Sequence, residues 1–139
     1  MTPTPYLFFN GTCAEALATY AQVFGGEVTE MMPASQLPAE YAVPEDRRDW
    51  VMHACLTIGQ GRIMASDDVT GQATPMAGCS VMMSLASAGE AKAAFNALAE
   101  GGTVGMAFAP TFWSAGFGVL TDRFGTKWMI GTDEAPGSQ

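Results

Sequence analysis

His53 and Cys55 are the two residues whose types and spacing best suit chemistry. They lie two positions apart in the stretch from Asp49 to Asp68, DWVMHACLTIGQGRIMASDD, which holds the only histidine of the chain. An imidazole exchanges protons near neutral pH, and a thiol becomes a nucleophile when it loses its proton. His53 is therefore a candidate general base or ligand-orienting donor, and Cys55 is a candidate nucleophile.

Each of these residues also has a structural interpretation. His53 would then be an inward-facing histidine hydrogen-bonded to a neighbour, and Cys55 would be a buried free thiol. For His53 the two interpretations stay open. For Cys55 the structural one is favoured, because the sequence shows no third group that would orient the pair.

A hairpin of two strands must position both residues. From Trp50 to Ile58 the even-numbered side chains are all apolar, whereas the odd-numbered ones include His53, Cys55 and Thr57. Since strand side chains alternate between faces, one face is apolar and the other is mixed. This pattern predicts a sheet that packs on helices behind and faces a semi-polar hollow in front.

The order of elements around this hairpin occurs twice. Each copy has a strand, a helix with a capping-box pattern and a double-glycine stop, a second strand and a hairpin. The first copy uses Pro5 to Asn10, Thr12 with Glu15, Gly25 and Gly26, Glu27 to Pro33, and the hairpin with its Gly59 to Gly61 turn and Arg62 to Ser66. The second uses Ser80 to Ala86, Ser87 with Glu90, Gly101 and Gly102, Thr103 to Phe108, and Phe117 to Thr121 with Lys127 to Ile130.

The repeat predicts an α+β fold of two tandem βαβββ units. We expect a single domain over residues 1–139, with units at 5–68 and 79–132, a linker at 69–78 and a tail at 133–139. Ala34 to Arg48 has two prolines and a charged run, which is typical of a long binding loop or lid. Asp67 and Asp122 each follow a strand and are explained by turn chemistry.

Composition excludes several classes of partner. The 139 residues carry 14 acidic and 6 basic side chains, for a formal net charge of -8, which repels nucleic acid and anionic membranes. No apolar run is long enough for a membrane helix, and the N-terminal stretch MTPTPYLFFN lacks the basic region of a signal peptide, so we expect a cytoplasmic protein. The three cysteines lack CxxC spacing and predict neither disulfides nor a structural zinc site.

Several motifs resemble one known family. They are YLFFNGTCAEAL from Tyr6, VFGGE from Val23, VMHACLTIG from Val51, IMASD from Ile63, TFWSAGFG from Thr111 and TDRFGTKWMI from Thr121. In this order they are similar to the PhnB-like branch of the vicinal oxygen chelate (glyoxalase/bleomycin resistance/dioxygenase) superfamily. The resemblance implies two rolled mixed sheets, a ligand or metal held on their concave side, and a homodimer.

The metal chemistry of that superfamily is not carried over. Metal-dependent members take His and Glu ligands from the first and last strands of each unit, and here the centres of those strands contain none. We therefore predict no cofactor and no tightly bound divalent metal. Some similar chains carry the label of demethylubiquinone methyltransferases. A methyl-donor site usually has a glycine-rich loop after a parallel strand, whereas Gly101 to Gly105 follows a helix, so we reject this label.

The functional hypothesis is a cup-shaped cavity that binds a small, partly apolar molecule, either as a binding module or as an enzyme with weak metal demands. The alternative is a metal-dependent lyase, isomerase or dioxygenase that uses His53 and Asp67 with water. His53 is the one catalytic candidate. The aromatic loop from Thr111 to Phe117 would either close over the ligand or form the dimer contact. The predicted ligand-binding residues are His53, Cys55, Met64, Ser66, Phe112, Trp113, Phe117 and Trp128.

Overall fold

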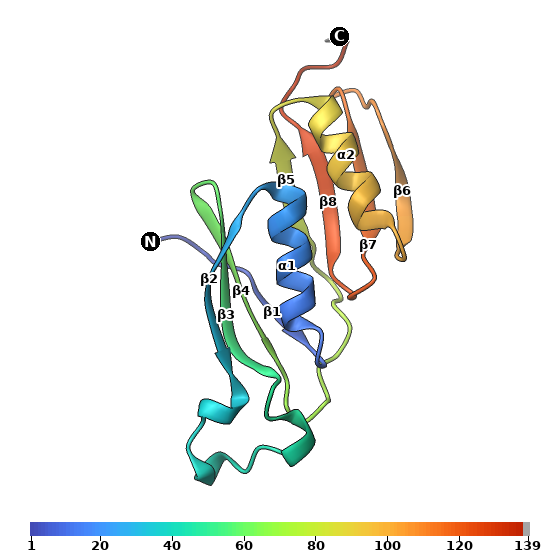
Figure 1. The fold of residues 1–139 in the computed structure, drawn as a ribbon. Helices are drawn as coiled ribbons and strands as arrows, with labels where there is room; N and C mark the ends of the chain where they lie inside the picture. The colour runs from blue at the N-terminus through green and yellow to red at the C-terminus, as the bar shows by residue number, and fades with distance from the viewer. Residues whose placement is uncertain (138–139) are drawn as a thin grey trace. The chain divides into compact units, whose positions relative to one another are not determined.

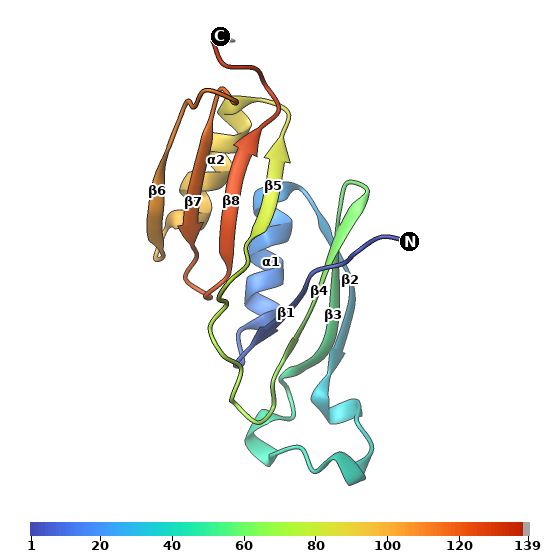
Figure 2. The same cartoon turned by 180° about the vertical axis from the view of Figure 1, so that it is seen from behind.

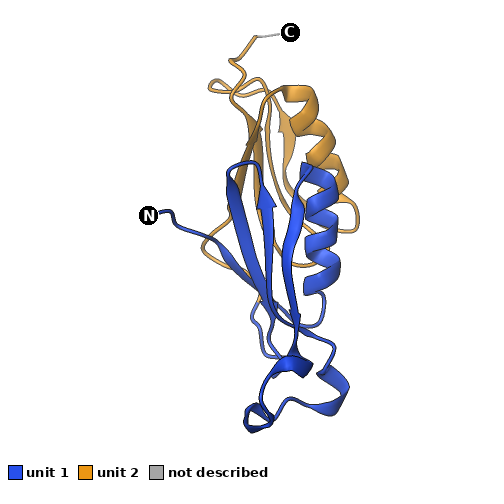
Figure 3. Cartoon of the chain, turned by 60° about the vertical axis from the view of Figure 1, so that its left-hand side comes forward, with its two compact units in different colours: residues 1–74 blue, residues 75–139 orange. Residues whose placement is uncertain are grey.

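The chain folds into two compact units, which are residues 1–74 and 75–139 (Figure 3). The structure is a computed structural model and describes residues 1–137, so the end of the predicted 133–139 tail lies outside the described residues. Each unit has one four-stranded mixed sheet with a single helix across one face (Figures 1 and 2). The predicted α+β fold class is confirmed. Neither helix in the described part of the chain has the length and apolar character to span a membrane.

Unit 1 contains the hairpin with His53. Its sheet has the order β1-β4-β3-β2, in which β1 and β4 run parallel and the other neighbours antiparallel. The predicted long loop after β2 contains three short 3-10 turns, at Ala34–Gln36, Ala39–Tyr41 and Glu45–Arg47. The main elements are β1 (Tyr6–Phe9), α1 (Cys13–Phe24), β2 (Glu27–Pro33), β3 (Val51–Ile58) and β4 (Gly61–Asp67).

Unit 2 repeats this arrangement. Its sheet has the order β5-β8-β7-β6, again with one parallel pair, β5 and β8, and two antiparallel pairs. The predicted internal repeat is therefore present in the strand order as well as in the sequence. The elements are β5 (Val81–Leu85), α2 (Ala88–Ala99), β6 (Thr103–Ala109), β7 (Phe117–Thr121) and β8 (Lys127–Thr132).

The core of each unit lies between the sheet and its helix. In unit 1, Leu7, Ala65 and Ala54 are register partners across β1, β4 and β3, and all three are buried. They share their burial with Leu17 and Tyr20 of α1. Burial of such apolar area contributes about 25 cal/mol per Å² and fixes which residues of each strand face the helix.

The two helices begin with different caps. Ser87 accepts a hydrogen bond from the Glu90 amide, as the capping-box pattern predicts. The hydroxyl of Thr12 makes no capping bond, and the same prediction is wrong at this position. Instead of the Thr12 hydroxyl, the buried carboxylate of Asp67 accepts a hydrogen bond from the Cys13 amide. An anion at this position is stabilised by the positive end of the helix dipole.

Asp67 joins three segments of unit 1. Its Oδ1 accepts hydrogen bonds from the Gly11 amide at 2.8 Å and from the Cys13 amide at 3.0 Å. Its Oδ2 accepts one from the Val51 amide at 2.9 Å. The residue is buried at the end of β4. It thus ties the segment after β1, the start of α1 and the start of β3 to one strand end, which is more than the turn role predicted for it.

Replacing Asp67 with Asn should destabilise unit 1 by about 2–3 kcal/mol, because one acceptor oxygen becomes a donor that faces backbone amides. Chemical denaturation of the purified protein measures this change. Asp49→Asn is the matched control: Asp49 is exposed close to the start of β3, and we expect a change within about 0.5 kcal/mol. Equal stability of the Asp67→Asn variant and the native protein would contradict the role assigned to this carboxylate.

Candidate functional site

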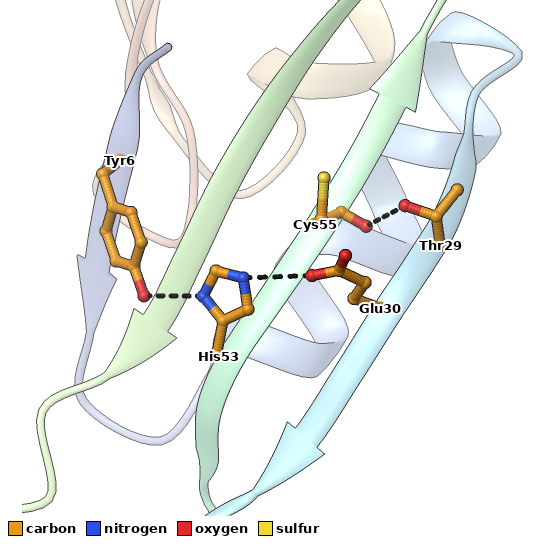
Figure 4. Close-up of polar contacts among 5 residues, drawn as sticks. All are labelled: Tyr6, Thr29, Glu30, His53 and Cys55. Carbon is orange, nitrogen blue, oxygen red and sulfur yellow. Dashed lines mark hydrogen bonds and ion pairs between the residues drawn. The ribbon is translucent and has the colours of Figure 1, made fainter.

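The candidate site lies on the open face of unit 1, by which we mean the face of its sheet opposite α1. His53 and Cys55 both project from β3 onto this face, while α1 lies behind the strands (Figure 4). Ala54 and Leu56, between and after them in sequence, are buried on the helix side. The predicted division of the hairpin into an apolar and a mixed face is therefore confirmed.

His53 sits at the centre of a hydrogen-bonded network. Its Nδ1 lies 3.1 Å from the Tyr6 hydroxyl oxygen, and its Nε2 lies 3.2 Å from Oε2 of Glu30 (Figure 4). A carboxylate only accepts hydrogen bonds, so Nε2 carries a proton and donates it to Glu30. In the neutral imidazole Nδ1 is then an acceptor, and the Tyr6 hydroxyl donates to it. We call these three residues the Tyr-His-Glu network.

Three strands of one sheet supply this network, and β4 lies between the strands of Tyr6 and His53. Tyr6 comes from β1, His53 from β3 and Glu30 from β2, and the Tyr6 ring also packs near Phe8 and His53. The His53 side chain is 29% exposed and that of Glu30 is 60% exposed, so solvent screens their attraction. The contact with Glu30 therefore orients the imidazole more than it stabilises the fold.

Sequence reasoning missed Glu30 because of a β-bulge. Val28 is opposite Leu56 and Glu30 is opposite Cys55, so Thr29 is an extra residue in β2. A regular ladder would have placed Thr29 opposite Cys55 and turned Glu30 toward α1. The bulge reverses this and brings the carboxylate onto the open face. The sequence placed Tyr6 in the first strand, but its hydrogen bond to His53 could be inferred only once the strand order was known.

Three other predicted ligand-binding residues share the open face. Met64 is the register partner of both Tyr6 and Cys55, and Ser66 is the partner of Phe8. Met64 is half-buried, whereas Ser66 is buried and Cys55 is only 3% exposed. Their placement beside the network agrees with the prediction that they line one surface, and their contact with a ligand stays a prediction.

The predicted aromatic residues belong to unit 2. Phe112 and Trp113 are exposed in the loop before β7, and their rings meet edge to face at 4.8 Å. Trp113 also contacts the buried Phe117 at 5.4 Å. The hydroxyl of Ser114 holds the loop from inside by donating to the carbonyl of Thr132 at 2.7 Å. The loop thus presents an anchored aromatic surface.

Trp128 is placed differently from the expectation. A Cβ on Gly118 would lie 2.6 Å from the Phe95 ring of α2, so this face of β7 packs on the helix. Leu120, two residues on, shares that face, and Trp128 is its register partner. The Trp128 side chain is fully buried and donates its indole N–H to Asp122. It is a core residue, and we remove it from the ligand-binding set.

The two units differ most at the Tyr-His-Glu network. In unit 1 the row of register partners across β1, β4, β3 and β2 is Tyr6, Met64, Cys55 and Glu30. In unit 2 the corresponding row is Met82, Met129, Val119 and Met106. The position of His53, two residues before Cys55, corresponds to Phe117. One unit therefore carries a polar network and the other an apolar, methionine-rich row.

The residues present do not fit a divalent metal site. On the first and last strands of each unit, the side chains that point away from the helix offer a phenol, hydroxyls and thioethers, but no imidazole or carboxylate. Those positions are Tyr6, Phe8, Met64, Ser66, Met82, Ser84, Met129 and Gly131. Among residues 1–137, no three or more His, Cys, Asp and Glu side chains lie together as a metal-binding group.

The alternative pairing of His53 with Asp67 as metal ligands is wrong. His53 lies on the open face, whereas both Asp67 oxygens accept backbone amides at the N-terminus of α1 and the start of β3. A buried carboxylate committed to three amides has no oxygen facing the imidazole.

Comparisons with known proteins agree with this architecture. A profile of the Glyoxalase/Bleomycin resistance protein/Dioxygenase superfamily matches residues 4–130. Protein YjdN of Escherichia coli (strain K12) is 33% identical over 141 residues, covering 94% of each chain. The crystal structure of protein PA1353 from Pseudomonas aeruginosa matches with a TM-score of 0.87 and 43% identity, over 96% of this chain and 98% of that one.

A more distant structure shares the fold. A Bacillus cereus protein described as a putative 3-demethylubiquinone-9 3-methyltransferase, PhnB protein, matches with a TM-score of 0.80 and 23% identity, over 95% of this chain and 99% of that chain. At this level of identity the likeness concerns the fold alone.

The three cysteines differ sharply in accessibility. Cys13 and Cys55 are buried and Cys79 is exposed, and all three are free thiols. Burial, and to a lesser extent the neighbouring Asp67 carboxylate, raises the pKa of Cys13 to about 12. Cys13 thus stays a protonated thiol at the start of α1, and its burial there gives it a packing role.

In the folded protein, N-ethylmaleimide should alkylate Cys79 readily. The alkylation rates of Cys13 and Cys55 should be at least about 100-fold lower, because buried thiols react only after local opening. Peptide mass spectrometry over a time course measures the three rates, and alkylation in denaturant is the control that all three thiols are intact. Alkylation of Cys55 as fast as that of Cys79 would contradict its burial and reopen its role as a nucleophile.

Proposed function

Because this chain belongs to the Glyoxalase/Bleomycin resistance protein/Dioxygenase superfamily, we propose that it is a PhnB-like member that binds a small, partly apolar molecule on the open face of unit 1. The bound molecule contacts the Tyr-His-Glu network through a polar group and the neighbouring side chains through an apolar body. This binding does not require a divalent metal.

The observation that carries the proposal is the Tyr-His-Glu network within an apolar surround. Two hydrogen bonds, of 3.1 Å and 3.2 Å, hold the imidazole between a phenol and a carboxylate. Phe8 lies exposed beside Tyr6, with their ring centroids 5.1 Å apart. A few oriented polar groups beside aromatic and thioether surface are typical of small-molecule sites.

Charge narrows the class of ligand. The chain carries a formal net charge of -8, and Glu30 adds its own charge directly at the site. A potential of this sign disfavours anions and favours neutral or cationic molecules. A flat, neutral molecule with one hydroxyl or carbonyl group matches both the aromatic surface and the network.

The aromatic loop of unit 2 has two proposed roles that the described contacts leave equal. Phe112 and Trp113 would either contact a bound apolar molecule or form the interface of a homodimer. The ligand experiment below separates the two, because only the first role makes binding depend on Phe112.

The neutral aromatic alcohol 2-naphthol should bind the native protein and raise its melting temperature. Phe8→Ala should weaken binding about tenfold, since one aromatic contact is worth roughly 1.4 kcal/mol. His53→Gln should weaken it similarly by removing the hydrogen-bond partner. Titration calorimetry measures affinity, and thermal unfolding measures the shift with and without EDTA.

Phe112→Ala tests the role of the aromatic loop, because it removes an exposed phenylalanine ring of unit 2. Weakened affinity in this variant would assign the aromatic loop to the ligand, and unchanged affinity would leave it for dimer contact. Stabilisation that appears only after Mn²⁺, Ni²⁺, Zn²⁺ or Fe²⁺ is added would favour the metal-dependent enzyme. Absence of 2-naphthol binding at millimolar concentration would contradict the proposal for this ligand class.

A further inference from the structure

We propose that Tyr6 is the reactive group of this site, a phenol whose proton passes to His53 while its oxygen attacks a small neutral electrophile. Glu30 is the positioning residue that holds the imidazole in the required tautomer. The inference rests on the proposed function for the place where the small molecule lies, and it adds a chemical activity to that place.

The geometry is that of a nucleophile, a base and an orienting acid. The hydroxyl of Tyr6 lies within hydrogen-bond reach of Nδ1, and the opposite ring nitrogen donates to a carboxylate. This order of groups is the general signature of an activated nucleophile. It also resolves the tautomer, because a proton on Nε2 leaves Nδ1 as the nitrogen that can accept from Tyr6.

Tyr6 is also the accessible nucleophile beside the base. Its side chain lies on the open face of β1, and the residue is 39% exposed. Cys55 projects onto the same face but is only 3% exposed. A small molecule that arrives from solvent therefore meets the phenol oxygen before it meets the thiol.

The backbone fixes the phenol in place. Tyr6 pairs with Met64 in the parallel ladder between β1 and β4, and the Met64 amide donates to the Pro5 carbonyl at 3.0 Å. The Tyr6 ring also packs near Phe8 and His53, with centroid distances of 5.1 Å and 5.8 Å. Such preorganisation is what positions a reacting group without further ordering.

The other two tyrosines provide internal standards. Tyr20 is fully buried in the core of unit 1. Tyr41 is 62% exposed in a 3-10 turn, more than Tyr6, but the only histidine of the chain is engaged with Tyr6. Exposure alone therefore predicts that Tyr41 reacts faster than Tyr6, whereas the Tyr-His-Glu network predicts the reverse order.

Benzenesulfonyl fluoride is a small, flat and neutral electrophile that tests this order. In the expected step the Tyr6 oxygen forms a bond to sulfur, the sulfur–fluorine bond breaks and fluoride leaves. The phenol proton moves to Nδ1 of His53, and the imidazolium is held by Glu30. The imidazolium then returns its proton to water, and an aryl sulfonate ester remains on Tyr6.

Peptide mass spectrometry of the intact, folded chain gives the labelling rate at each tyrosine. We expect Tyr6 to be labelled at least about tenfold faster than Tyr41. This ratio lies below the rate acceleration of about 10²- to 10⁴-fold that general-base catalysis typically supplies. His53→Gln should reduce the Tyr6 rate to that of Tyr41 or below it, because exposure alone favours Tyr41. Glu30→Gln should reduce it only about threefold, because the carboxylate is exposed.

The controls separate a chemical role from a structural one. Labelling of Tyr41 should not change in either variant, and Tyr20 should stay unlabelled as long as unit 1 is folded. Tyr41 labelled as fast as Tyr6, or a Tyr6 rate that is unchanged by His53→Gln, would overturn the inference.

Bound 2-naphthol distinguishes the two proposals. It should slow the labelling of Tyr6 and leave that of Tyr41 unchanged. If 2-naphthol binds but Tyr6 shows no rate advantage, the reactive tyrosine is overturned and the binding function stands. If Tyr6 shows the rate advantage but 2-naphthol neither binds nor protects it, the reactive tyrosine is supported and the binding function fails for this ligand class.

Discussion

The buried carboxylate of Asp67 is the interaction on which the arrangement of unit 1 depends. It accepts amides from the segment that follows β1, from the first residue of α1 and from the first residue of β3. Tyr6 lies on β1, and His53 lies two residues after the amide of Val51 that Asp67 holds. One anion at the end of β4 thus ties the segment after the strand of the phenol to the start of the strand of the imidazole. The buried acidic residue Asp67 is thus structural, while the carboxylate of the site comes from the edge strand β2.

The repeat shows how one backbone carries two different surfaces. Both units share the same strand order, the same parallel pair and a bulge at the same place in the edge strand, after Val28 in β2 and after Val104 in β6. In unit 1 the bulge turns Glu30 onto the open face, and in unit 2 it turns Met106 onto the face of its own sheet opposite α2. The chemistry of the site therefore resides in a few side chains and not in the fold, as is usual for widely used folds. The name of the Bacillus cereus neighbour is accordingly no guide to the activity of this chain.

Much of the fold followed from the sequence, because it depends on local and periodic signals. Alternation located the faces of the hairpin, glycines marked the helix ends, and the repeat gave the second unit with strand limits close to the observed ones. The site was predicted only in part. His53 and its face were expected, but Glu30 reached it through a bulge that no local pattern reveals. Trp128 was misplaced for the related reason that its face depends on which strands pair with β8. Asp67 acts over long sequence separations, so its role as a helix cap was hidden as well.

The most direct test of the Tyr-His-Glu network is the ¹⁵N spectrum of the single histidine. Selective labelling gives signals from His53 alone, at a pH where the imidazole is neutral. The account predicts a proton on Nε2 and an Nδ1 signal shifted by hydrogen bonding. In Tyr6→Phe that signal should move toward that of a free nitrogen, with no change in Tyr41→Phe. A proton on Nδ1, or an Nδ1 signal identical in the native protein and Tyr6→Phe, would contradict the account.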